Sequence, residues 1–186
     1  MDHRELVRNA LKGKPSAQKA LYDLFAPDML AVCYRYTKSV EDAEDVLQEG
    51  FVKAFLNLHQ YRFEGELGGW IRRIMVHSAL NFLKKRAPYN SGFSFDSDHL
   101  HPVAQEDPEV RLDAKELAAL VRQLPTGYQA IFNLYAVEGY SHAEIGQLLG
   151  IAEGTSRSQY ARARALLITW IRRQEDNTQT VSYARK

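Results

Sequence analysis

The sequence has little cysteine and no long apolar run, and these two features bear directly on the compartment in which a protein works. Its 186 residues include one cysteine, Cys33, so the chain cannot form an internal disulfide or hold a metal between paired cysteines. This scarcity favours a reducing compartment, and the apolar run MLAVCYRY predicts a buried thiol. No stretch reaches the ~18 apolar residues of a membrane span. The start, MDHRELVRNALKGK, lacks the apolar core of a signal peptide. We therefore expect a cytoplasmic protein without membrane insertion.

Charge of one sign is not in excess, but the charges are sorted along the chain. Lysine and arginine number 24 and aspartate and glutamate 23, which leaves a formal net charge of +1. The segments 41–49 and 96–109 each carry five acids and no base, whereas 67–95 carries five bases and no acid. The segment 141–173 carries five arginines against two glutamates. Two basic segments separated by an acidic one fit a nucleic-acid partner best.

Motifs of catalysis are also missing. There is no glycine-rich phosphate loop, no His-Glu-x-x-His pair, and no serine or cysteine nucleophile in a plausible triad. The six histidines are scattered, and only His99 and His101 lie close together. Both fall in the acidic segment, where we interpret them as part of a solvated loop rather than as a weak metal site. The sequence therefore predicts a protein that is not an enzyme, with no cofactor and no metal.

Strand-like alternation is absent beyond a few residues, which predicts an all-α fold. Four helices are expected first, at about 4–12, at 17–25, from Pro27, and from an N-cap at Ser39. The glycine-rich stretch FEGELGG at 63–69 predicts a loop, and WIRRIMVHSALNFLKKR at 70–86 predicts the next helix. Periodicity then disappears for about twenty residues, which is uncommon inside one domain. We expect two small helical domains joined by a flexible acidic linker.

The C-terminal part predicts two helices followed by a helix-turn-helix. PEVRLDAKELAALVRQL and TGYQAIFNLYAVEG each have helical periodicity and are separated by a proline. Ser141 and Glu144 have the spacing of a capping box, and Gly150 suits the left-handed position after a helix end. A short helix should therefore run between these signals. A second helix should begin near Gly154 or Thr155.

This second helix has two unlike faces when its residues are placed at ~100° intervals. One face is mainly apolar and holds Ser156, Ala163, Leu166, Leu167 and Trp170. The opposite face is basic and slim and holds Arg157, Ser158, Ala161, Arg164, Ala165 and Arg172, with Arg162 at its edge. A slim helix face fits the DNA major groove, and arginine reaches both phosphates and guanine edges. The pattern predicts a DNA-binding helix-turn-helix at about 141–160 and the turn that follows.

Blocks in both halves of the chain resemble one family. LPTGYQAIFNLYAVEGYSHAEIGQLLGIAEGTSRSQYARARALL is similar to the C-terminal, −35-reading domain of bacterial RNA polymerase sigma factors of the extracytoplasmic-function (ECF) type, in the sigma-70 superfamily. FAPDMLAVCYRYTKSVEDAEDVLQEGFVKAFLNL and WIRRIMVHSALNFLKKR resemble their N-terminal, core-binding and −10-reading domain. The resemblance implies a sigma region 2 domain at 1–87, a linker at 88–111, a sigma region 4 helix-turn-helix domain at 112–173 and a polar tail at 174–186.

The resemblance also implies a function and its residues. It implies a sigma factor that binds core RNA polymerase and directs promoter-specific transcription initiation by recognising −10 and −35 DNA. It assigns polymerase docking to Asp42, Asp45, Gln48 and Glu49. It assigns −10 DNA binding to Gly65, Arg72, Arg73, His77, Asn81, Lys84, Lys85 and Arg86. It assigns −35 DNA binding to Thr155, Ser156, Arg157, Ser158, Arg162 and Arg164.

Three positions depart from the family's pattern. His77 stands where asparagine is common, Asn81 where aspartate is common, and Gln159 where a basic residue is frequent. The helical angle turns Gln159 inward or sideways. These departures leave the base preference at −10 and one phosphate contact at −35 open. Trp70, by contrast, stands at a position that is mainly structural in the family.

Two other classes of protein stay open from the residues. A helix-turn-helix regulator that dimerises on DNA would need an effector pocket or a dimer helix in 17–87, where the sequence instead has an acidic helix, a glycine-rich loop and a basic helix. A protein-only adaptor is disfavoured by the two basic segments. The resemblance implies core RNA polymerase and promoter DNA as partners. In many relatives an anti-sigma factor covers both DNA-binding domains, and such a protein is a third possible partner.

Overall fold

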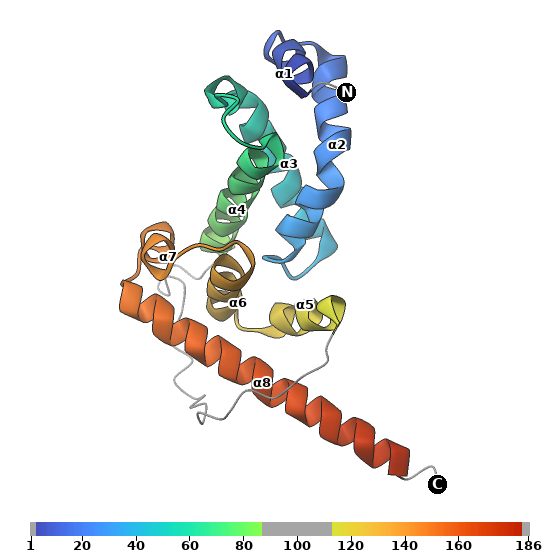
Figure 1. Cartoon of the computed structure of the whole chain (residues 1–186), viewed down its shortest axis with the longest axis vertical. Coiled ribbons are helices and arrows are strands. Elements are labelled where there is room, and N and C mark those ends of the chain that lie inside the picture. Colours follow the sequence, from blue (N-terminus) through green and yellow to red (C-terminus); the bar gives the residue numbers. More distant parts are fainter. Residues whose placement is uncertain (1–2, 87–112, 184–186) are drawn as a thin grey trace. The chain divides into compact units, whose positions relative to one another are not determined.

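The computed structural model describes residues 3–86 and 113–183, and every regular element in these ranges is a helix (Figure 1). The expected all-α fold is thereby confirmed. The chain divides into two compact units, an N-terminal unit of residues 1–86 and a C-terminal unit of residues 87–186. The predicted linker at 88–111, with His99 and His101, lies outside the described residues. No helix among the described residues is long and apolar enough to cross a membrane.

The N-terminal unit is built from four α-helices and one short 3-10 helix. In chain order these are α1 (His3–Leu11), α2 (Pro15–Tyr34), α3 (Val40–Asn57), η1 (Leu58–Gln60) and α4 (Leu67–Arg86). α2, α3 and α4 each pack against the other two, and α1 packs on α2. The core of the unit therefore lies where these three long helices meet.

One helix boundary predicted from the sequence is wrong. Instead of a break before Pro27, α2 continues through this proline without interruption. Proline inside a helix removes a backbone hydrogen bond and costs ~3 kcal/mol or more. The side chains of Met29, Val32 and Cys33, which follow the proline, are buried in the core of the unit, as is Leu21 before it. Burying an aliphatic side chain contributes ~1.5–3 kcal/mol, so this burial offsets the cost of the proline.

Cys33 is fully buried, as the apolar run around it predicts. Desolvation by burial raises the pKa of its thiol to about 12. The thiol therefore stays protonated at neutral pH and behaves as a small apolar side chain.

α3 begins where its cap predicts. The side chain of Ser39 accepts a hydrogen bond from the backbone N–H of Asp42, which satisfies one of the amides exposed at a helix start. The face of α3 that packs inward holds Ala43, Val46, Leu47, Gly50, Phe51 and Ala54. A Cβ atom on Gly50 would lie 2.2 Å from the sulfur of Met75 in α4, so this glycine lets the two helices approach closely.

The predicted loop at 63–69 is shorter than expected, because α4 already begins at Leu67. Leu67 is buried, and a Cβ on Gly68 would lie 3.2 Å from the ring of Phe25, so these first residues of the helix are packed against the unit. Gly65 keeps a left-handed backbone, with φ +79°, and turns the remaining loop.

The C-terminal unit contains α5 (Ala114–Gln123), α6 (Thr126–Phe132), a π-helical segment η2 (Asn133–Val137), α7 (His142–Leu149) and α8 (Glu153–Tyr183). Its core joins α5 and α6 to α8 and is made of Leu120, Val121, Leu124, Tyr128, Ala163, Leu166, Leu167 and Ile171. The backbone of α8 stays helical past the domain end expected at residue 173.

Candidate nucleic-acid interface

The predicted helix-turn-helix is confirmed in the C-terminal unit. The hydroxyl of Ser141 accepts from the N–H of Glu144 at 3.3 Å, and a carboxylate oxygen of Glu144 accepts from the N–H of Ser141 at 2.8 Å, which completes a capping box. The hydroxyl of Ser141 also donates to this carboxylate oxygen at 2.8 Å, and the two hydrogen bonds from the backbone and side chain of Ser141 lower the pKa of Glu144. α7 ends at Gly150, whose φ of 74° is left-handed. α8 begins at Glu153, slightly before the predicted start.

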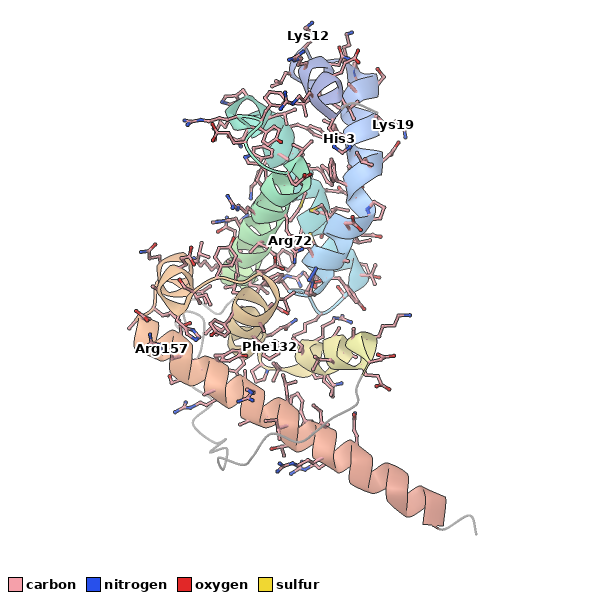
Figure 2. The ribbon with its side chains drawn as sticks, in the orientation of Figure 1. His3, Lys12, Lys19, Arg72, Phe132 and Arg157 are labelled. Carbon is pink, nitrogen blue, oxygen red and sulfur yellow. The ribbon has the colours of Figure 1, made fainter. Side chains whose placement is uncertain are left out.

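The first half of α8 presents a basic face to solvent. Arg157, Ser158, Ala161 and Arg164 are exposed, and Arg162 and Thr155 are partly exposed. Figure 2 labels Arg157 at the end of α8 that adjoins α7, where its guanidinium pairs with Glu153. Ala163, Leu166 and Leu167 on the opposite side are buried in the core. The helix is thus anchored on one side while small residues and arginines face outward on the other.

One residue expected to bind DNA does not lie on this face. Ser156 is fully buried, and its hydroxyl lies 2.9 Å from Nδ1 of His142. Its position in the helix turns it toward the interior, so the assignment of Ser156 as a DNA contact is wrong for this structure. Gln159 is also buried, with 5% of its surface exposed, so of the two directions that the helical angle leaves open, inward or sideways, the structure has the inward one.

In the N-terminal unit, one face of α4 is polar and basic. Arg73, His77, Asn81 and Lys84 are all exposed, and their spacing of three or four residues places them along one side of the helix. Arg72 falls about 100° away from Arg73 on the helix and is partly buried. The structure therefore brings four of the expected −10 residues together and separates Arg72 from them.

A groove of about 430 Å³ runs between this face of α4 and α3. Arg73, His77 and Asn81 line one wall, and Lys53 and Asn57 of α3 line the other. Sequence reasoning missed these two α3 residues as members of the candidate site. The available signal was the four-residue spacing of Glu49, Lys53 and Asn57, which puts them on one side of α3.

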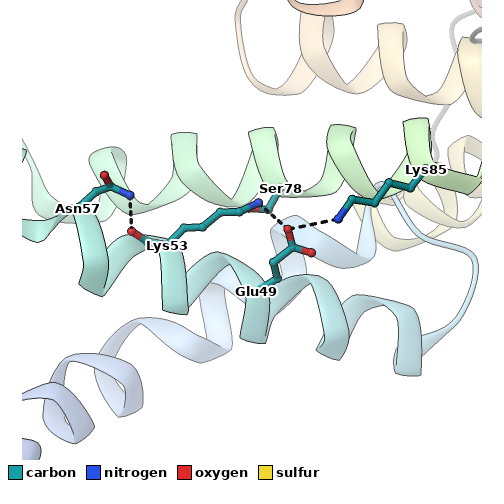
Figure 3. Close-up of polar contacts among 5 residues, drawn as sticks. All are labelled: Glu49, Lys53, Asn57, Ser78 and Lys85. Carbon is teal, nitrogen blue, oxygen red and sulfur yellow. Dashed lines mark hydrogen bonds and ion pairs between the residues drawn. The ribbon is translucent and has the colours of Figure 1, made fainter.

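Lys53 is held in place by both helices (Figure 3). Its amino group donates to a carboxylate oxygen of Glu49 at 2.6 Å and to the hydroxyl of Ser78 at 3.2 Å. Asn57 donates its side-chain amide to the backbone carbonyl of Lys53 at 2.8 Å. Desolvation in the groove lowers the pKa of His77, and the nearby charges of Lys84 and Lys53 lower it further. The groove thus brings the cationic side chains of Lys53 and Arg73 together with the amides of Asn57 and Asn81, a lining that suits an anionic ligand.

The remaining basic residues of α4 pair with acids of α3. Arg86 donates to a carboxylate oxygen of Asp42 at 2.8 Å, and its guanidinium lies 4.6 Å from the ring centroid of Phe82. The amino group of Lys85 lies 3.9 Å from Glu49 (Figure 3). The hydrogen bond from Lys53 lowers the pKa of Glu49 and outweighs desolvation by burial, which raises it; the charges of Lys53 and Lys85 add smaller lowering effects. Two expected docking acids therefore contact residues expected to bind DNA.

The other two docking candidates, Asp45 and Gln48, are exposed on α3. The same outward side carries two apolar residues that sequence reasoning missed, Val52 with 58% and Leu56 with 70% of its surface exposed. Residues at this spacing share a helix face. The face combines acidic, polar and apolar side chains, a composition that suits a protein partner better than DNA.

The loop before α4 is stabilised by its own contacts. The hydroxyl of Tyr61 donates to the carbonyl oxygen of Gly65 at 2.9 Å. The ring of Tyr61 lies 5.1 Å from that of Phe63 and 5.7 Å from that of Trp70, measured between centroids. Trp70 is partly buried. It belongs to this aromatic cluster and also borders the groove between α3 and α4.

Comparison with known proteins assigns both units to one class. Residues 21–88 match the family model described as sigma-70 region 2, and residues 114–167 match that of sigma-70 region 4. Among curated relatives, the ECF RNA polymerase sigma factor SigM of Mycobacterium tuberculosis is 31% identical over 131 residues, which cover 70% of this chain and 65% of SigM. The ECF RNA polymerase sigma factor SigW of Bacillus subtilis is 25% identical over 175 residues, which cover 88% of this chain and 94% of SigW. The chain therefore belongs to the sigma-70 family and is of the ECF type.

The match to SigM spans less than two thirds of that relative's length. A solved structure, the sigma factor RpoE in complex with the anti-sigma factor NepR from Bartonella quintana, is 22% identical with a TM-score of 0.49. It covers 80% of this chain and 92% of that chain. Within the described part of the chain, no group of three or more metal-ligating side chains is gathered together.

Proposed function

We propose that this chain is a promoter-recognition subunit that binds core RNA polymerase and directs transcription initiation from promoters with −10 and −35 elements. The observation that carries the proposal is the outward basic face of α8 in a helix-turn-helix, joined in one chain to a second basic groove in a separate unit. A bipartite promoter needs two such surfaces. Subunits of this kind have no catalysis and no cofactor of their own.

The C-terminal unit would read −35 duplex with α8. Arg157 and Arg164 are exposed on a face whose neighbours are small, so the helix can enter a major groove about 12 Å wide. Ser158 donates its hydroxyl to the carbonyl of Thr155 at 3.0 Å, which leaves its oxygen able to accept from a base edge. Arg162, at the edge of the face, is suited to a phosphate.

The N-terminal unit would hold −10 DNA in the groove between α3 and α4. Lys53 and Arg73 in the groove, with Lys84 exposed on the same face of α4, supply positive charge for backbone phosphates. Asn57 and Asn81 supply amides that can pair with base edges. The adjoining loop with Gly65 would allow close approach of an unstacked strand. A base preference different from that of relatives would follow from His77 and Asn81.

Polymerase docking would use the outward face of α3. Asp45 and Gln48 provide polar contacts, and Val52 and Leu56 provide apolar area that a partner can bury. Asp42 and Glu49 would join this interface by exchanging their partners on α4 for groups of the polymerase. An anti-sigma protein that covers both basic surfaces is a further candidate partner.

The domain limits of this assignment are a −10 and docking domain at 1–87, a linker at 88–111, a −35 domain at 112–173 and a polar tail at 174–186. The site of action would be the cytoplasm, because bacterial RNA polymerase and the chromosome are there.

The deciding experiment is run-off transcription with purified core polymerase on a library of random promoters, with and without the chain. The proposal expects a set of templates to be initiated only when the chain is present. Templates initiated no better than by core alone, together with binding of double-stranded sites as a dimer, would establish instead a dimeric helix-turn-helix regulator.

A further inference from the structure

A cluster of side chains joins three elements of the C-terminal unit at the start of α8. His142 is the first residue of α7, Tyr135 lies in η2, and Ser156 and Tyr160 lie in the first turns of α8. The ring of His142 stacks on that of Tyr135, with 4.2 Å between centroids and 7° between planes. Tyr160 closes the cluster, with its ring centroid 4.6 Å from Tyr135 and 5.9 Å from His142.

The polar contact in this cluster crosses from one helix to the other. Nδ1 of His142 and the hydroxyl oxygen of Ser156 are 2.9 Å apart. Ser156 is fully buried, so without the imidazole of His142 the hydroxyl of Ser156 would have no partner and no access to water. A buried polar group without a partner costs ~1–3 kcal/mol, which makes the bond a strong local constraint.

The hydrogen bond between His142 and Ser156 constrains the part of α8 whose next residues face outward. Ser156 directly precedes Arg157 and Ser158, and all three lie within the first two turns of the helix. A short turn, Gly150 to Ala152, sets the separation of α7 and α8. A side-chain bond between the two helices additionally fixes how α8 is rotated about its own axis. That rotation decides where the exposed side chains point.

We propose that His142 is a positioning residue for the DNA-reading helix. Through its bond to Ser156 and its stack on Tyr135, it holds the first turn of α8 in the rotation that directs Arg157 and Ser158 toward DNA. The inference rests on the proposed −35 reading, because it names the group that orients that surface.

The surroundings of His142 favour the neutral form of its imidazole ring. Desolvation lowers its pKa, and Arg157 lowers it further, against a smaller opposite effect of Glu153. The start of a helix also disfavours a cation. A neutral imidazole keeps one nitrogen as donor and the other as acceptor, so it can pair with a hydroxyl in either sense.

The test compares specific with non-specific binding by the full chain. The wild-type chain first selects a duplex from a random-sequence library, and affinities are then measured for this duplex and for a scrambled duplex of equal length. His142→Phe keeps an aromatic ring for the stack and removes Nδ1, while Ser156→Ala removes the hydroxyl. Each should weaken binding of the selected duplex about fivefold, the equivalent of one hydrogen bond, and leave the scrambled duplex unchanged.

Two further variants sharpen the result. The double variant should bind no more weakly than either single variant, because both remove the same contact. His142→Asn places a polar atom near the position of Nδ1 and should recover most of the discrimination. His59→Phe, at an exposed histidine of the N-terminal unit, is the matched control and should change nothing.

The alternatives give different results. Equal loss of affinity for both duplexes, or no loss for either, would overturn the positioning role while the proposed function stands. Failure of the wild-type chain to select any duplex would overturn the −35 reading and this inference with it. If His142→Phe does not fold, as judged by circular dichroism, Ser156→Ala and His142→Asn decide the question.

Discussion

Lys53 lies on α3, but its contacts make it part of the groove beside α4. Its amino group reaches Ser78 of α4 as well as Glu49 of its own helix. A cation fixed at this point adds to the field of Lys84 around His77. Both walls of the groove therefore favour an anion, and the lowered pKa keeps His77, on the α4 wall, neutral at neutral pH.

This arrangement predicts a pH-dependent affinity for −10 DNA. The pKa of His77 is lowered in the free protein, and a bound phosphate would raise it, because the imidazolium then gains an opposite charge. The complex therefore takes up a proton that the free protein does not hold, and affinity should rise as the pH falls through the pKa that His77 has in the complex. Fluorescence anisotropy of a single-stranded −10 oligonucleotide between pH 5.5 and 8 measures this.

His77→Asn should flatten that pH profile and retain binding at pH 8, since the amide keeps hydrogen-bonding capacity without titrating. His59→Asn, at an exposed histidine that does not line the groove, serves as control and should preserve the wild-type slope. An unchanged slope in His77→Asn would show that His77 does not lie near a bound phosphate.

Among the helices, the turn between α7 and α8 requires the backbone of α7 at Gly146 to lie close to the backbone of the turn at Ile151. A Cβ on Gly146 would lie 2.8 Å from the carbonyl oxygen of Ile151, and backbone at that point cannot move aside as a flexible side chain could. Gly146 is buried on the inner side of α7. The close packing of the turn against α7 is therefore possible because Gly146 has no side chain.

Gly146→Ala should destabilise the C-terminal unit by about 1–3 kcal/mol, the usual cost of overpacking. Gly154→Ala is the matched control, because Gly154 lies in the first turn of α8 and a Cβ there would meet nothing within 4 Å. That change should be neutral or stabilise by up to about 1 kcal/mol through reduced chain entropy. Thermal unfolding of both variants provides the comparison, and equal shifts in the two would contradict the proposed close approach.

The outward face of α3 is the surface that we propose binds core polymerase. Leu56→Asp places a charge where 70% of an apolar side chain is exposed, so it should leave the fold intact. If this face docks on polymerase, the change removes buried apolar area and should weaken binding of core polymerase about tenfold or more. Surface plasmon resonance with immobilised core polymerase would measure the effect.

Leu11→Asp, at an exposed leucine at the end of α1, is the control for a charge added to an exposed apolar position. Duplex binding by the C-terminal unit should be unaffected in both variants. Equal polymerase affinity in Leu56→Asp and wild type would remove this face from the proposed interface.

Elements were predictable from the sequence where local signals were strong. The caps at Ser39 and Ser141 and the left-handed Gly150 each mark a helix end that the structure confirms. Pro27, Gly68 and Gly69 led to wrong helix boundaries, because tertiary burial of nearby apolar residues outweighs the local preference of proline and glycine for breaks. Such burial cannot be known before the packing partners are known.

At the scale of the whole molecule, each unit carries one basic surface, and each surface was partly visible in the sequence. The helical angle correctly separated the buried side of α8 from its arginines, because that side depends on one helix alone. It could not show that Lys53 and Asn57 of α3 complete a groove with α4, or that Asp42 pairs with Arg86. Those contacts join residues far apart in the chain, and they depend on how two helices pack.

The most direct test of the whole account is run-off transcription from one promoter selected by the chain with core polymerase. The selected template is compared with two versions in which only the −10 or only the −35 element is scrambled. The account predicts strong initiation on the intact promoter when chain and core are both present, and a marked loss on each scrambled version. Initiation that is independent of the chain, or unaffected by scrambling either element, would contradict it.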